Sequence, residues 1–439
     1  MRIAMIGTGY VGLVSGACLS EFGHTVVCVD KLEEKIAALR AGQIPIFEPR
    51  LDEIVAASVK AGRLSFETDI AAAARGADAV FIAVGTPSRR GDGHADLTYV
   101  YDAAEEIAAA LEGYTVVVTK STVPVGTSRE VEAIIRRVRP QAQFDMASNP
   151  EFLREGSAIE DFRRPDRVVV GCDTERAQSV MREIYRPLYL HETPIVFTSR
   201  ESSELIKYAA NAFLATKISF INEMADLCEK VGADVQDVAR GIGLDGRIGN
   251  KFLHAGPGFG GSCFPKDTLA LRKTAQDKGA PTRIVEAVIG VNDARKLAMA
   301  AKIEQAFGGV QGKTVAILGL TFKPNTDDMR DAPSLVIVPD LQAKGATIRA
   351  FDPEGGKEAR KLLDIDLCKD AYDALDGADG VVILTEWNEF RALDTARMKM
   401  LLKRPLMVDL RNIYRPSQMA EAGFTYVSVG RATAAPARA

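Results

Sequence analysis

A glycine-rich stretch that runs into a cysteine is the part of the sequence most suited to covalent chemistry. Four glycines lie within residues 256–261, and Cys263, Lys266 and Asp267 follow closely. Glycines let a ligand approach the main chain, a nearby cation favours the nucleophilic thiolate, and a carboxylate can position or activate water. Taken alone, the stretch fits equally well a glycine-rich turn beside an inert, buried cysteine. The rest of the sequence must decide whether Cys263 is a nucleophile or an inert, buried cysteine.

The start of the chain carries a dinucleotide-binding pattern. Residues 2–6 predict a short buried strand, G-x-G-x-x-G fills residues 7–12, and a helical stretch extends to about residue 22. A second predicted strand, residues 25–29, ends at Asp30. In this context the glycines make the turn, admit a pyrophosphate and let the helix pack on the strand. We expect the dinucleotide to contact Gly7, Gly9 and Gly12. A glycine-rich turn without a nucleotide is the alternative.

Asp30 indicates which dinucleotide is bound. A carboxylate at this position hydrogen-bonds the ribose hydroxyls while the helix N-terminus faces the phosphates, which favours NAD over NADP. Lys31 and Lys35 leave NADP open, because a nearby cation can accept a 2′-phosphate.

Polar residues follow several further predicted strands. These strands are residues 79–84, 115–119, 144–148 and 167–171. In parallel sheets, ligands bind beyond the carboxyl ends of the strands. The polar residues that fall there are Thr86, Thr122, Glu151 and Glu155. Turn or helix-capping chemistry would explain each threonine equally well, and a solvated helix face would explain the glutamates.

One long helix is predicted over residues 200–231, which contain no proline or glycine. Lys207 and Asn211 lie one turn apart on a shared face and can point together into a cleft. The alternative is a lysine whose stem lies along a mostly buried helix and whose ammonium reaches water. A helix of this length between two α/β regions is a natural linker and a natural homodimer contact. Further helices are predicted to residue 307.

A third region, starting at residue 313, repeats the organisation of the first. A strand at residues 314–318 leads into a glycine turn, and a strand at residues 347–351 ends at Asp352. Further strands are predicted at residues 380–384, 406–410 and 425–429. The region lacks G-x-G-x-x-G, so we expect no second dinucleotide. The cations near its strand ends, which could hold a diphosphate, are Lys323, Arg330 and Arg411.

The predicted fold class is therefore α/β, with two doubly wound Rossmann-like domains joined by a long central helix and a helical middle domain. The expected divisions are an NAD-binding domain (1–199), a central helical domain (200–308), a C-terminal Rossmann-like domain (309–432) and a disordered tail (433–439).

Composition excludes several classes of protein. The 439 residues are 47% hydrophobic and 26% charged, with a net charge of −4, which argues against a general nucleic-acid binder. The N-terminus reads as a strand rather than a signal peptide, and no apolar run is long enough to span a membrane. Six scattered cysteines form no C-x-x-C pair and the four histidines have no metal-ligand spacing, so we expect no disulfide framework, no metal and a reducing cytoplasm.

NAD and a cysteine nucleophile together suggest a specific reaction. A thiolate adds to an aldehyde, and the resulting thiohemiacetal can be oxidised to a thioester that water hydrolyses. Such a site takes an alcohol or aldehyde to a carboxylate. A chain with NAD but no nucleophile would stop at the carbonyl.

The motifs also carry a family resemblance that extends to about residue 430. They are GTGYVGL (7–13), GTP (85–87), KSTVPVGT (120–127), NPEFLREG (149–156), the Glu204/Lys207/Asn211 helix, GFGGSCFPKD (258–267) and GLTFKPNTDDMR (319–330). The chain resembles the UDP-glucose/GDP-mannose dehydrogenase family, which oxidises a sugar C6 alcohol to a carboxylate. IFEPRLDEIV (46–55) and DGRIGNKFL (245–253) are similar to the UDP-glucose branch. GDP-mannose and UDP-N-acetylhexosamines are the near alternatives.

The resemblance implies a four-electron oxidation of UDP-glucose to UDP-glucuronate, with two NAD and one water consumed, and a role for each matching residue. Cys263 is the implied nucleophile, and Lys207, helped by Asn211, stabilises the alkoxide or oxyanion. Asp267, Glu151 and Thr122 are implied in proton transfer or hydrolysis. The implied NAD contacts, besides the three glycines, are Tyr10, Val11, Asp30, Lys35, Thr86, Thr122, Glu155, Lys266 and Arg330.

The implied substrate contacts form a second set. They are Glu151, Phe152, Leu153, Arg154, Glu155, Lys207, Asn211, Phe252, Leu253, His254, Ala255, Gly256, Gly260, Lys323 and Arg411, with Arg247 reaching the sugar from a neighbouring subunit. Two other classes stay open: a two-electron hydroxyacid dehydrogenase, in which Cys263 would be idle, and a non-catalytic NAD-binding regulator.

Overall fold

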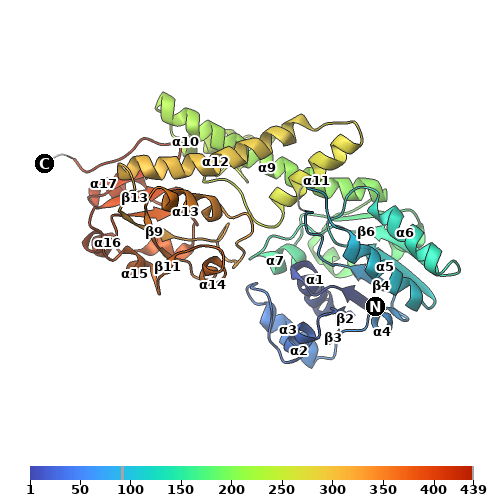
Figure 1. The fold of residues 1–439 in the computed structure, drawn as a ribbon. Coiled ribbons are helices and arrows are strands. Elements are labelled where there is room, and N and C mark those ends of the chain that lie inside the picture. Colours follow the sequence, from blue (N-terminus) through green and yellow to red (C-terminus); the bar gives the residue numbers. More distant parts are fainter. Residues whose placement is uncertain (90–92, 438–439) are drawn as a thin grey trace. The chain divides into compact units, whose positions relative to one another are not determined.

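The computed structural model describes residues 1–89 and 93–437, and the chain divides into two compact units. The first contains Met1–Ala210 and Leu269–Ala280, and the second contains Asn211–Thr268 and Pro281–Ala439. Each unit is built around one β-sheet (Figure 1). Helices α9 (Arg200–Val231) and α11 (Phe264–Asp277) each contribute residues to both units.

The sheet of the first unit has eight strands in the order β3-β2-β1-β4-β5-β6-β7-β8. Their bounds are β1 (Arg2–Ile6), β2 (Thr25–Val29), β3 (Leu64–Glu67), β4 (Ala79–Ile82), β5 (Tyr114–Thr119), β6 (Gln143–Ser148), β7 (Val168–Cys172) and β8 (Ile195–Thr198). Every neighbouring pair is parallel except β6 and β7, which are antiparallel.

Helices cover both faces of this sheet, because alternate strand residues point to opposite sides. Ile3 and Met5 of β1 belong to one buried cluster with α1, α2, α3, α7 and α8, while Ala4 and Ile6 belong to another with α4, α5 and α6. The bounds are α1 (Tyr10–Glu21), α2 (Glu33–Arg40), α3 (Leu51–Lys60), α4 (Ile70–Ala74), α5 (Thr98–Ala110), α6 (Thr127–Val138), α7 (Ala158–Arg163), α8 (Glu175–Ile184) and the 3-10 helix η1 (Arg186–His191).

The sheet of the second unit is fully parallel and has the order β11-β10-β9-β12-β13-β14. Its strands are β9 (Thr314–Leu318), β10 (Thr347–Phe351), β11 (Asp366–Leu367), β12 (Gly380–Ile383), β13 (Leu406–Asp409) and β14 (Thr425–Ser428). Its helices are α10 (Val235–Gly243), α12 (Arg283–Phe307), α13 (Ser334–Ala343), α14 (Gly356–Arg360), α15 (Ala371–Leu375), η2 (Asn388–Ala392), α16 (Thr395–Leu401) and α17 (Pro416–Glu421).

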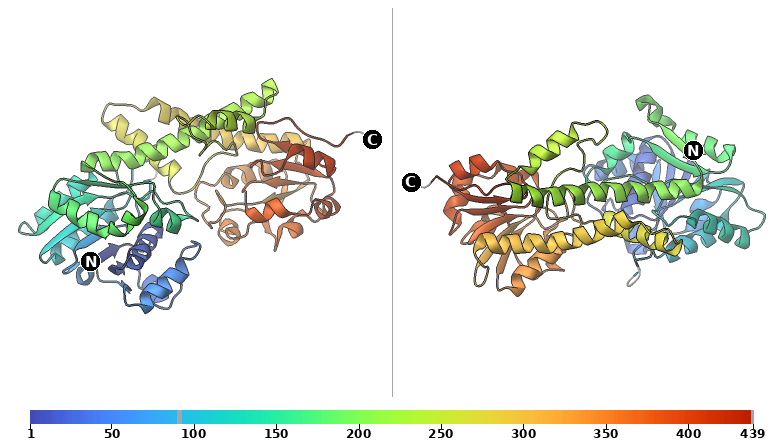
Figure 2. Two further views of the ribbon diagram at one scale, coloured as in Figure 1. Left: turned by 180° about the vertical axis from the view of Figure 1, so that it is seen from behind. Right: turned by 90° about the horizontal axis from the view of Figure 1, so that it is seen from above.

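Two long helices brace the second unit. The part of α9 in this unit runs alongside α12 (Figure 2), and the pairs Lys302–Glu229 at 2.7 Å and Arg295–Asp226 link them. Both helices contribute to the cluster that covers one face of the sheet, and α15, α16 and α17 contribute to the cluster on the other face.

These two sheets and the helical region between them in sequence confirm the predicted fold class. Three strands, β3, β8 and β11, were not predicted, and the strand expected over residues 79–84 ends at Ile82. The predicted tail differs too, because Ala434 exchanges two backbone hydrogen bonds with Tyr426 of β14 and is held to the sheet. Residues 438–439 of that tail lie outside the described residues. Within residues 1–89 and 93–437, no helix is long and apolar enough to cross a membrane.

Candidate active site

The turn between β1 and α1 has the geometry of a dinucleotide-binding turn. Gly7 has φ +103° and its N–H donates to the Val29 carbonyl at 2.7 Å. A Cβ on Gly12 would lie 2.0 Å from the Gly7 oxygen, so only glycine fits there. A Cβ on Gly9 would meet nothing within 4 Å. The fold therefore requires glycine at 12, whereas at 9 glycine keeps the N-terminus of α1 open.

Asp30 lies at the end of β2 beside this turn. Its Oδ2 accepts hydrogen bonds from the Thr8 N–H at 3.1 Å, the Thr8 hydroxyl at 2.7 Å and the Lys35 ammonium at 2.9 Å. Burial raises the pKa of Asp30, but Lys35 and Thr8 outweigh it and hold the pKa below its ordinary value. Lys31 is paired with Glu106. Both lysines that left NADP open are thus bound to carboxylates, which favours NAD.

Other predicted cofactor residues lie around the same edge of the sheet. Thr86, after β4, donates its hydroxyl to the carbonyl of Thr122, after the neighbouring strand β5, at 3.0 Å. Burial and the hydrogen bond to Glu48 raise the pKa of the Tyr10 hydroxyl, and the nearby charge of Glu155 raises it further. Val11 is half-buried in the first turn of α1. The structure therefore joins Thr86 to Thr122 beyond the carboxyl ends of β4 and β5, and it places Glu155 near Tyr10 at the turn.

A buried ion pair joins Glu151, after β6, to Lys207 on α9. The Lys207 Nζ and Glu151 Oε1 are 2.9 Å apart, and the two side chains are 3% and 6% exposed. The Leu153 N–H also donates to the Glu151 carboxylate, at 2.5 Å. Burial would raise the pKa of Glu151, but the Lys207 charge and these hydrogen bonds lower it below the ordinary value. The pair supplies a fixed carboxylate and a fixed ammonium within one unit.

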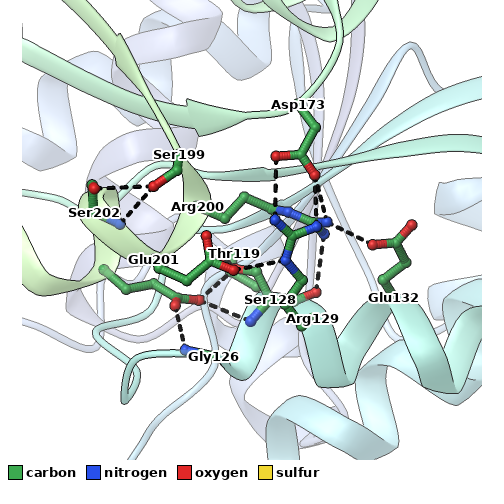
Figure 3. Close-up of polar contacts among 11 residues, drawn as sticks. Thr119, Gly126, Ser128, Arg129, Glu132, Asp173, Ser199, Arg200, Glu201 and Ser202 are labelled. Carbon is green, nitrogen blue, oxygen red and sulfur yellow. Dashed lines mark hydrogen bonds and ion pairs between the residues drawn. The ribbon is translucent and has the colours of Figure 1, made fainter.

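An ionic network fixes the first turn of α9, and with it Lys207. The buried Arg200 guanidinium pairs with Asp173 and Glu132, both at 2.7 Å (Figure 3). Arg129 bridges Asp173 and Glu201, also at 2.7 Å in each case. The start of α9 is thereby tied to α6 and to the end of β7.

Glu204, one turn before Lys207, sets the rotation of α9. Its carboxylate accepts from the Gly126 N–H at 2.6 Å, the Ser128 N–H at 2.8 Å and the Ser128 hydroxyl at 2.6 Å. These donors form the N-terminus of α6, where a carboxylate is stabilised by the helix dipole. Burial nevertheless raises the pKa of Glu204. Glu204 therefore holds Lys207 in the direction of Glu151.

The second unit contains the residues around Cys263. Asp267 is 1% exposed and accepts from the Asn211 amide at 2.6 Å and the Lys266 ammonium at 2.7 Å. Cys263 directly precedes α11, and its carbonyl accepts the Asp267 N–H at 2.8 Å. A helix N-terminus stabilises negative charge and so favours the thiolate. The Ser262 hydroxyl lies 3.5 Å from the Cys263 sulfur.

Cys263 differs from the other five cysteines in exposure. Cys263 is partly exposed, while all the others are buried. Burial raises the pKa of Cys18 and of Cys28 to about 12 and that of Cys172 to about 11, which keeps those thiols protonated. The environment therefore favours Cys263 as the nucleophile among the six.

The glycine-rich stretch before Cys263 is held from several sides within its unit. The Gly256 N–H donates to Asn222 at 2.8 Å, and its carbonyl accepts from Arg295 at 3.0 Å. Asn292 closes a pair of hydrogen bonds with the main chain of Phe259, at 2.8 and 3.1 Å. The stretch is consequently a fixed segment rather than a loose turn.

At two glycines of this stretch, the space that a side chain would need is filled by another segment of the protein. A Cβ on Gly260 would lie 2.3 Å from the Asp331 carbonyl, and one on Gly261 would lie 2.7 Å from the Phe322 ring. The sequence suggested that these glycines leave room for a ligand, but here they admit the segment after β9. Gly260 remains in the proposed substrate set only through its backbone.

Arg411, after β13, lies next to the same stretch. A Cβ on Gly256 would be 3.4 Å from an Arg411 nitrogen. The guanidinium donates to the carbonyls of Leu384 at 2.7 Å and Phe322 at 3.0 Å. The Lys323 ammonium lies 5.3 Å from the centre of the Phe322 ring. Gly256, Lys323 and Arg411 therefore gather at one end of the C-terminal sheet.

Several predicted contact residues have other partners in the structure. Arg154 pairs with Asp161 at 2.6 Å, and its side chain is 61% exposed. Arg247, 89% exposed, pairs with Asp245 at 2.6 Å.

The remaining predicted residues differ in how their side chains are placed. Arg330 pairs with Asp328 at 2.8 Å. Phe152 lies under the Arg167 guanidinium, Phe252 has a positive φ, and His254 is exposed. Leu253 and Ala255 are buried in the core of the second unit, so only their backbones are available to a ligand.

Two buried residues at these sites carried no prediction. Glu48 accepts hydrogen bonds from Tyr10, from the Gly156 N–H at 2.7 Å and from the Ala158 N–H at 2.8 Å. It thereby ties the dinucleotide turn to the segment that follows Glu155. The other is Lys120, which lies next to Asn149. The available signals were the motifs KSTVPVGT (120–127), which begins at Lys120, and IFEPRLDEIV (46–55), which contains Glu48. Neither motif indicated a role for these two residues.

Comparisons with known proteins cover nearly the whole chain. Three models of the UDP-glucose/GDP-mannose dehydrogenase family match it: the NAD binding domain at residues 1–189, the central domain at 201–294 and the UDP binding domain at 316–416. The NAD binding domain agrees with the cofactor that Asp30 indicates.

Individual relatives give the same result. The chain is 66% identical to a UDP-glucose 6-dehydrogenase of Rhizobium meliloti, with 98% of this chain and all of the relative covered. It is 49% identical to one from Bacillus subtilis, over 98% and 93%. The solved structure of a UDP-glucose dehydrogenase from Pyrobaculum islandicum is similar with a TM-score of 0.90 and 39% identity, over 98% of both chains. The chain belongs to the UDP-glucose/GDP-mannose dehydrogenase family.

Proposed function

We propose that the protein is an NAD-dependent UDP-glucose 6-dehydrogenase, which oxidises UDP-glucose to UDP-glucuronate with two NAD and one water per turnover. The observation that carries the proposal is Cys263, the one partly exposed cysteine, at the N-terminus of α11 with the Asp267–Asn211 pair in the next turn. A two-electron dehydrogenase has no use for such a thiol.

The residues of the chain divide the chemistry between them. NAD, when bound at the Gly7–Gly12 turn, accepts a hydride from sugar C6 in each of the two oxidations. Lys207 stabilises the alkoxide from which the first hydride leaves, and Glu151 takes part in moving its proton. The Cys263 thiolate then adds to the aldehyde carbon, and the carbonyl oxygen becomes the oxyanion of a thiohemiacetal.

The second oxidation and the release follow on the same sulfur. Loss of hydride from the thiohemiacetal gives a thioester, and attack of one water breaks the carbon–sulfur bond to give the acid and the free thiol. Asp267, held by Asn211 and Lys266, is placed to orient that water. Two hydrides leave per acid formed, which accounts for two NAD.

The substrate assignment rests on the names of the relatives and on the C-terminal unit. The relatives at 66%, 49% and 39% identity all bear the name of a UDP-glucose enzyme. Gly256, Lys323 and Arg411 offer main-chain and cationic groups for a nucleoside diphosphate. GDP-mannose and UDP-N-acetylhexosamines are the alternative substrates, and the assay separates them.

The test measures NADH absorbance with NAD and each of the three sugar nucleotides. UDP-glucose should give the highest kcat/KM and two NADH per sugar acid, whereas one NADH per sugar would point to a two-electron dehydrogenase. Cys263→Ser should still bind NAD but form no acid at the normal steady-state rate. Cys228→Ser, the same change at a buried cysteine, is the matched control and should keep its activity.

We further propose a cytoplasmic homodimer that forms through α9. Phe213, Phe220 and Leu227 repeat every seven residues on this helix and are 65%, 46% and 51% exposed, while Ile221 and Ala225 are fully buried. A heptad stripe of large apolar side chains suits a second copy of the same helix. Phe220→Asp should shift the mass measured by light scattering from two chains to one. An unchanged dimer would contradict this surface.

A further inference from the structure

Lys120 is a buried lysine to which the mechanism above gives no role. It directly follows β5 and is 3% exposed. Its ammonium donates to the Asn149 main-chain carbonyl at 3.3 Å, the Asn149 side-chain oxygen at 3.1 Å and the Tyr185 hydroxyl at 3.4 Å. All of these groups lie in the first unit.

The residue that Lys120 holds leads directly into the catalytic segment. Asn149 is also bound by the Tyr185 hydroxyl at 2.5 Å and donates to the Val169 carbonyl at 2.8 Å. Its N–H donates to the Thr119 carbonyl at 2.9 Å. Asn149 is therefore fixed through both main chain and side chain, two residues before Glu151.

The charges around Lys120 come from three parts of the unit. Glu151 attracts it, Lys207 of α9 repels it, and the phenol of Tyr185 contacts it without a charge. Burial, reinforced by Lys207 and opposed by Glu151, lowers the pKa of Lys120 to about 8. In turn Lys120 is one of the groups that lower the pKa of Glu151. With Lys120 protonated, two ammonium groups face one carboxylate.

A purely structural crosslink does not explain this arrangement well. Hydrogen bonds to Asn149 need only a neutral donor, and burying a charge is costly unless the charge is used. Here the charge acts on Glu151 and Lys207, the buried pair assigned to the proton and the oxyanion.

We propose that Lys120 is a positioning residue of the active site: it anchors Asn149, and its ammonium adds positive charge around the Glu151–Lys207 pair for an anionic intermediate. This inference rests on the proposed function. It predicts that activity depends on the charge of Lys120 and not only on its hydrogen bonds.

The pH dependence of kcat/KM separates the two roles. In Lys120→Met the pKa of Glu151 should rise, so the acid limb of the profile should move to higher pH. Lys120→Arg should keep the acid limb and move the alkaline limb upward, since arginine stays protonated. Tyr185→Phe removes a hydrogen bond but no charge, and both limbs should stay in place. Because methionine is uncharged at every pH, Lys120→Met should also be less active across the whole profile. An acid limb that stays in place in Lys120→Met would overturn the proposal.

A measurement without turnover separates this inference from the proposed function. Infrared spectra of the protein alone, with Glu151→Gln subtracted, report the carboxyl band of protonated Glu151. That band should appear in Lys120→Met at a pH where the unmodified protein shows none, whether or not UDP-glucose is the substrate. Its absence at the same pH would refute the charge role. If Lys120→Met does not fold, Lys120→Arg decides by its alkaline limb, and an unmoved limb refutes the role.

Discussion

In each sheet, a turn with a glycine of positive φ follows the first strand, and the surroundings of the two turns differ. In the first unit the Gly7 N–H donates to the Val29 carbonyl at 2.7 Å; in the second the Gly319 N–H donates to the Phe351 carbonyl at 2.8 Å. Both glycines have positive φ, +103° and +87°. In both units the second strand is followed at once by an aspartate. The backbone of the turn is thus shared, and the side chains decide what it can bind.

The two aspartates differ in how many donors they already have. Asp30 receives three hydrogen bonds on Oδ2 and one long contact of 3.3 Å on Oδ1, from the Leu32 N–H. Asp352 is 5% exposed, and every donor around it belongs to its own unit. Those donors are Leu320 N, Thr321 N, Thr321 Oγ1, Trp387 Nε1, Glu354 N and Gly355 N, at 2.7–3.2 Å. Asp30 can still accept hydrogen bonds from a ribose, whereas the acceptor positions of Asp352 are occupied by donors of its own unit.

The segment after each glycine differs as well. In the first unit α1 begins at Tyr10, three residues after Gly7, so its N-terminus is available to phosphate. In the second unit α13 begins only at Ser334, and the intervening segment packs against Gly260 and Gly261. A repeated strand–turn–strand pattern therefore does not by itself indicate a repeated ligand site.

We expect the largest effect from replacing Asp352, whose carboxylate accepts hydrogen bonds from six donors of its own unit. Asp352→Asn replaces one acceptor oxygen by an NH2 group that faces N–H donors, and should reduce the free energy of unfolding by about 3 kcal/mol. Trp387, the only tryptophan, donates to Asp352, so its fluorescence during urea unfolding reports the change. KM for NAD in the variant that remains folded should not change. A variant with normal stability but a raised KM for NAD would show that Asp352, and not only Asp30, serves cofactor binding.

Within the first turn, two glycines should behave in opposite ways. Gly12→Ala forces a Cβ against the Gly7 carbonyl and should cost about 2 kcal/mol of unfolding free energy. In Gly9→Ala the new Cβ meets open space, so the free energy of unfolding should fall by less than about 0.5 kcal/mol. The affinity for NAD should nevertheless fall by about tenfold or more, because the pyrophosphate approaches the main chain there. Urea unfolding and NAD titration measure the two quantities. Equal stability losses would show that the space above Gly9 is not reserved for a ligand.

Asp30→Ala should mainly affect the cofactor. We expect a KM for NAD raised by about tenfold, which corresponds to about 1.4 kcal/mol, because the ribose acceptor is lost. The free energy of unfolding should fall by less than about 1 kcal/mol, since the Lys35 pair is partly exposed. Asp78→Ala, which removes an aspartate from the opposite edge of the same sheet, should leave KM unchanged and serves as the control.

The smallest expected effect concerns the pH dependence of stability. Asp409, at the end of β13, accepts from three N–H groups and from Tyr426, yet burial raises its pKa above the ordinary value. The native state therefore binds this proton more tightly than the unfolded state, and stability falls as pH rises from about 4 through the raised pKa. Asp30, whose pKa is lowered, contributes the opposite slope.

Urea unfolding between pH 4 and 7 checks this sign. Asp409→Asn should remove the downward contribution, so the variant should gain stability relative to the unmodified protein as pH rises. A parallel pH dependence in the two proteins would show that Asp409 keeps an ordinary pKa.

The sequence predicted elements best where one local rule acted without competition. Helix α9 has the predicted bounds, because thirty-two residues without proline or glycine leave no internal stop signal. Strand β3 escaped prediction because only two of its four residues, Leu64 and Phe66, are apolar and buried, and its assignment depends on pairing with β2. The antiparallel β6–β7 pair escaped for a similar reason, since strand direction is set by partners distant in sequence.

The residues of the proposed site were chosen from the sequence by their types and motifs, and their pairings could not be predicted. Glu151 and Lys207, as well as Asn211 and Asp267, are 56 residues apart in each pair, and no spacing rule reports such a contact. The prediction that the glycines before Cys263 leave room for a ligand was partly wrong. The sequence shows that Gly260 and Gly261 lack side chains, but only the structure shows that Asp331 and Phe322 occupy the space.

The uneven burial of the cysteines has a consequence for how the protein meets reagents and oxidants. Five thiols lie in the core, so an alkylating agent such as iodoacetamide should modify the native chain once, at Cys263, and should do so more slowly when sugar nucleotide is bound. Peroxide should reach the same sulfur first, and a sulfenic acid there is reversible by thiols whereas a sulfinic acid is not. The thiol that we propose as the nucleophile of the second oxidation is thus also the thiol that oxidants reach first.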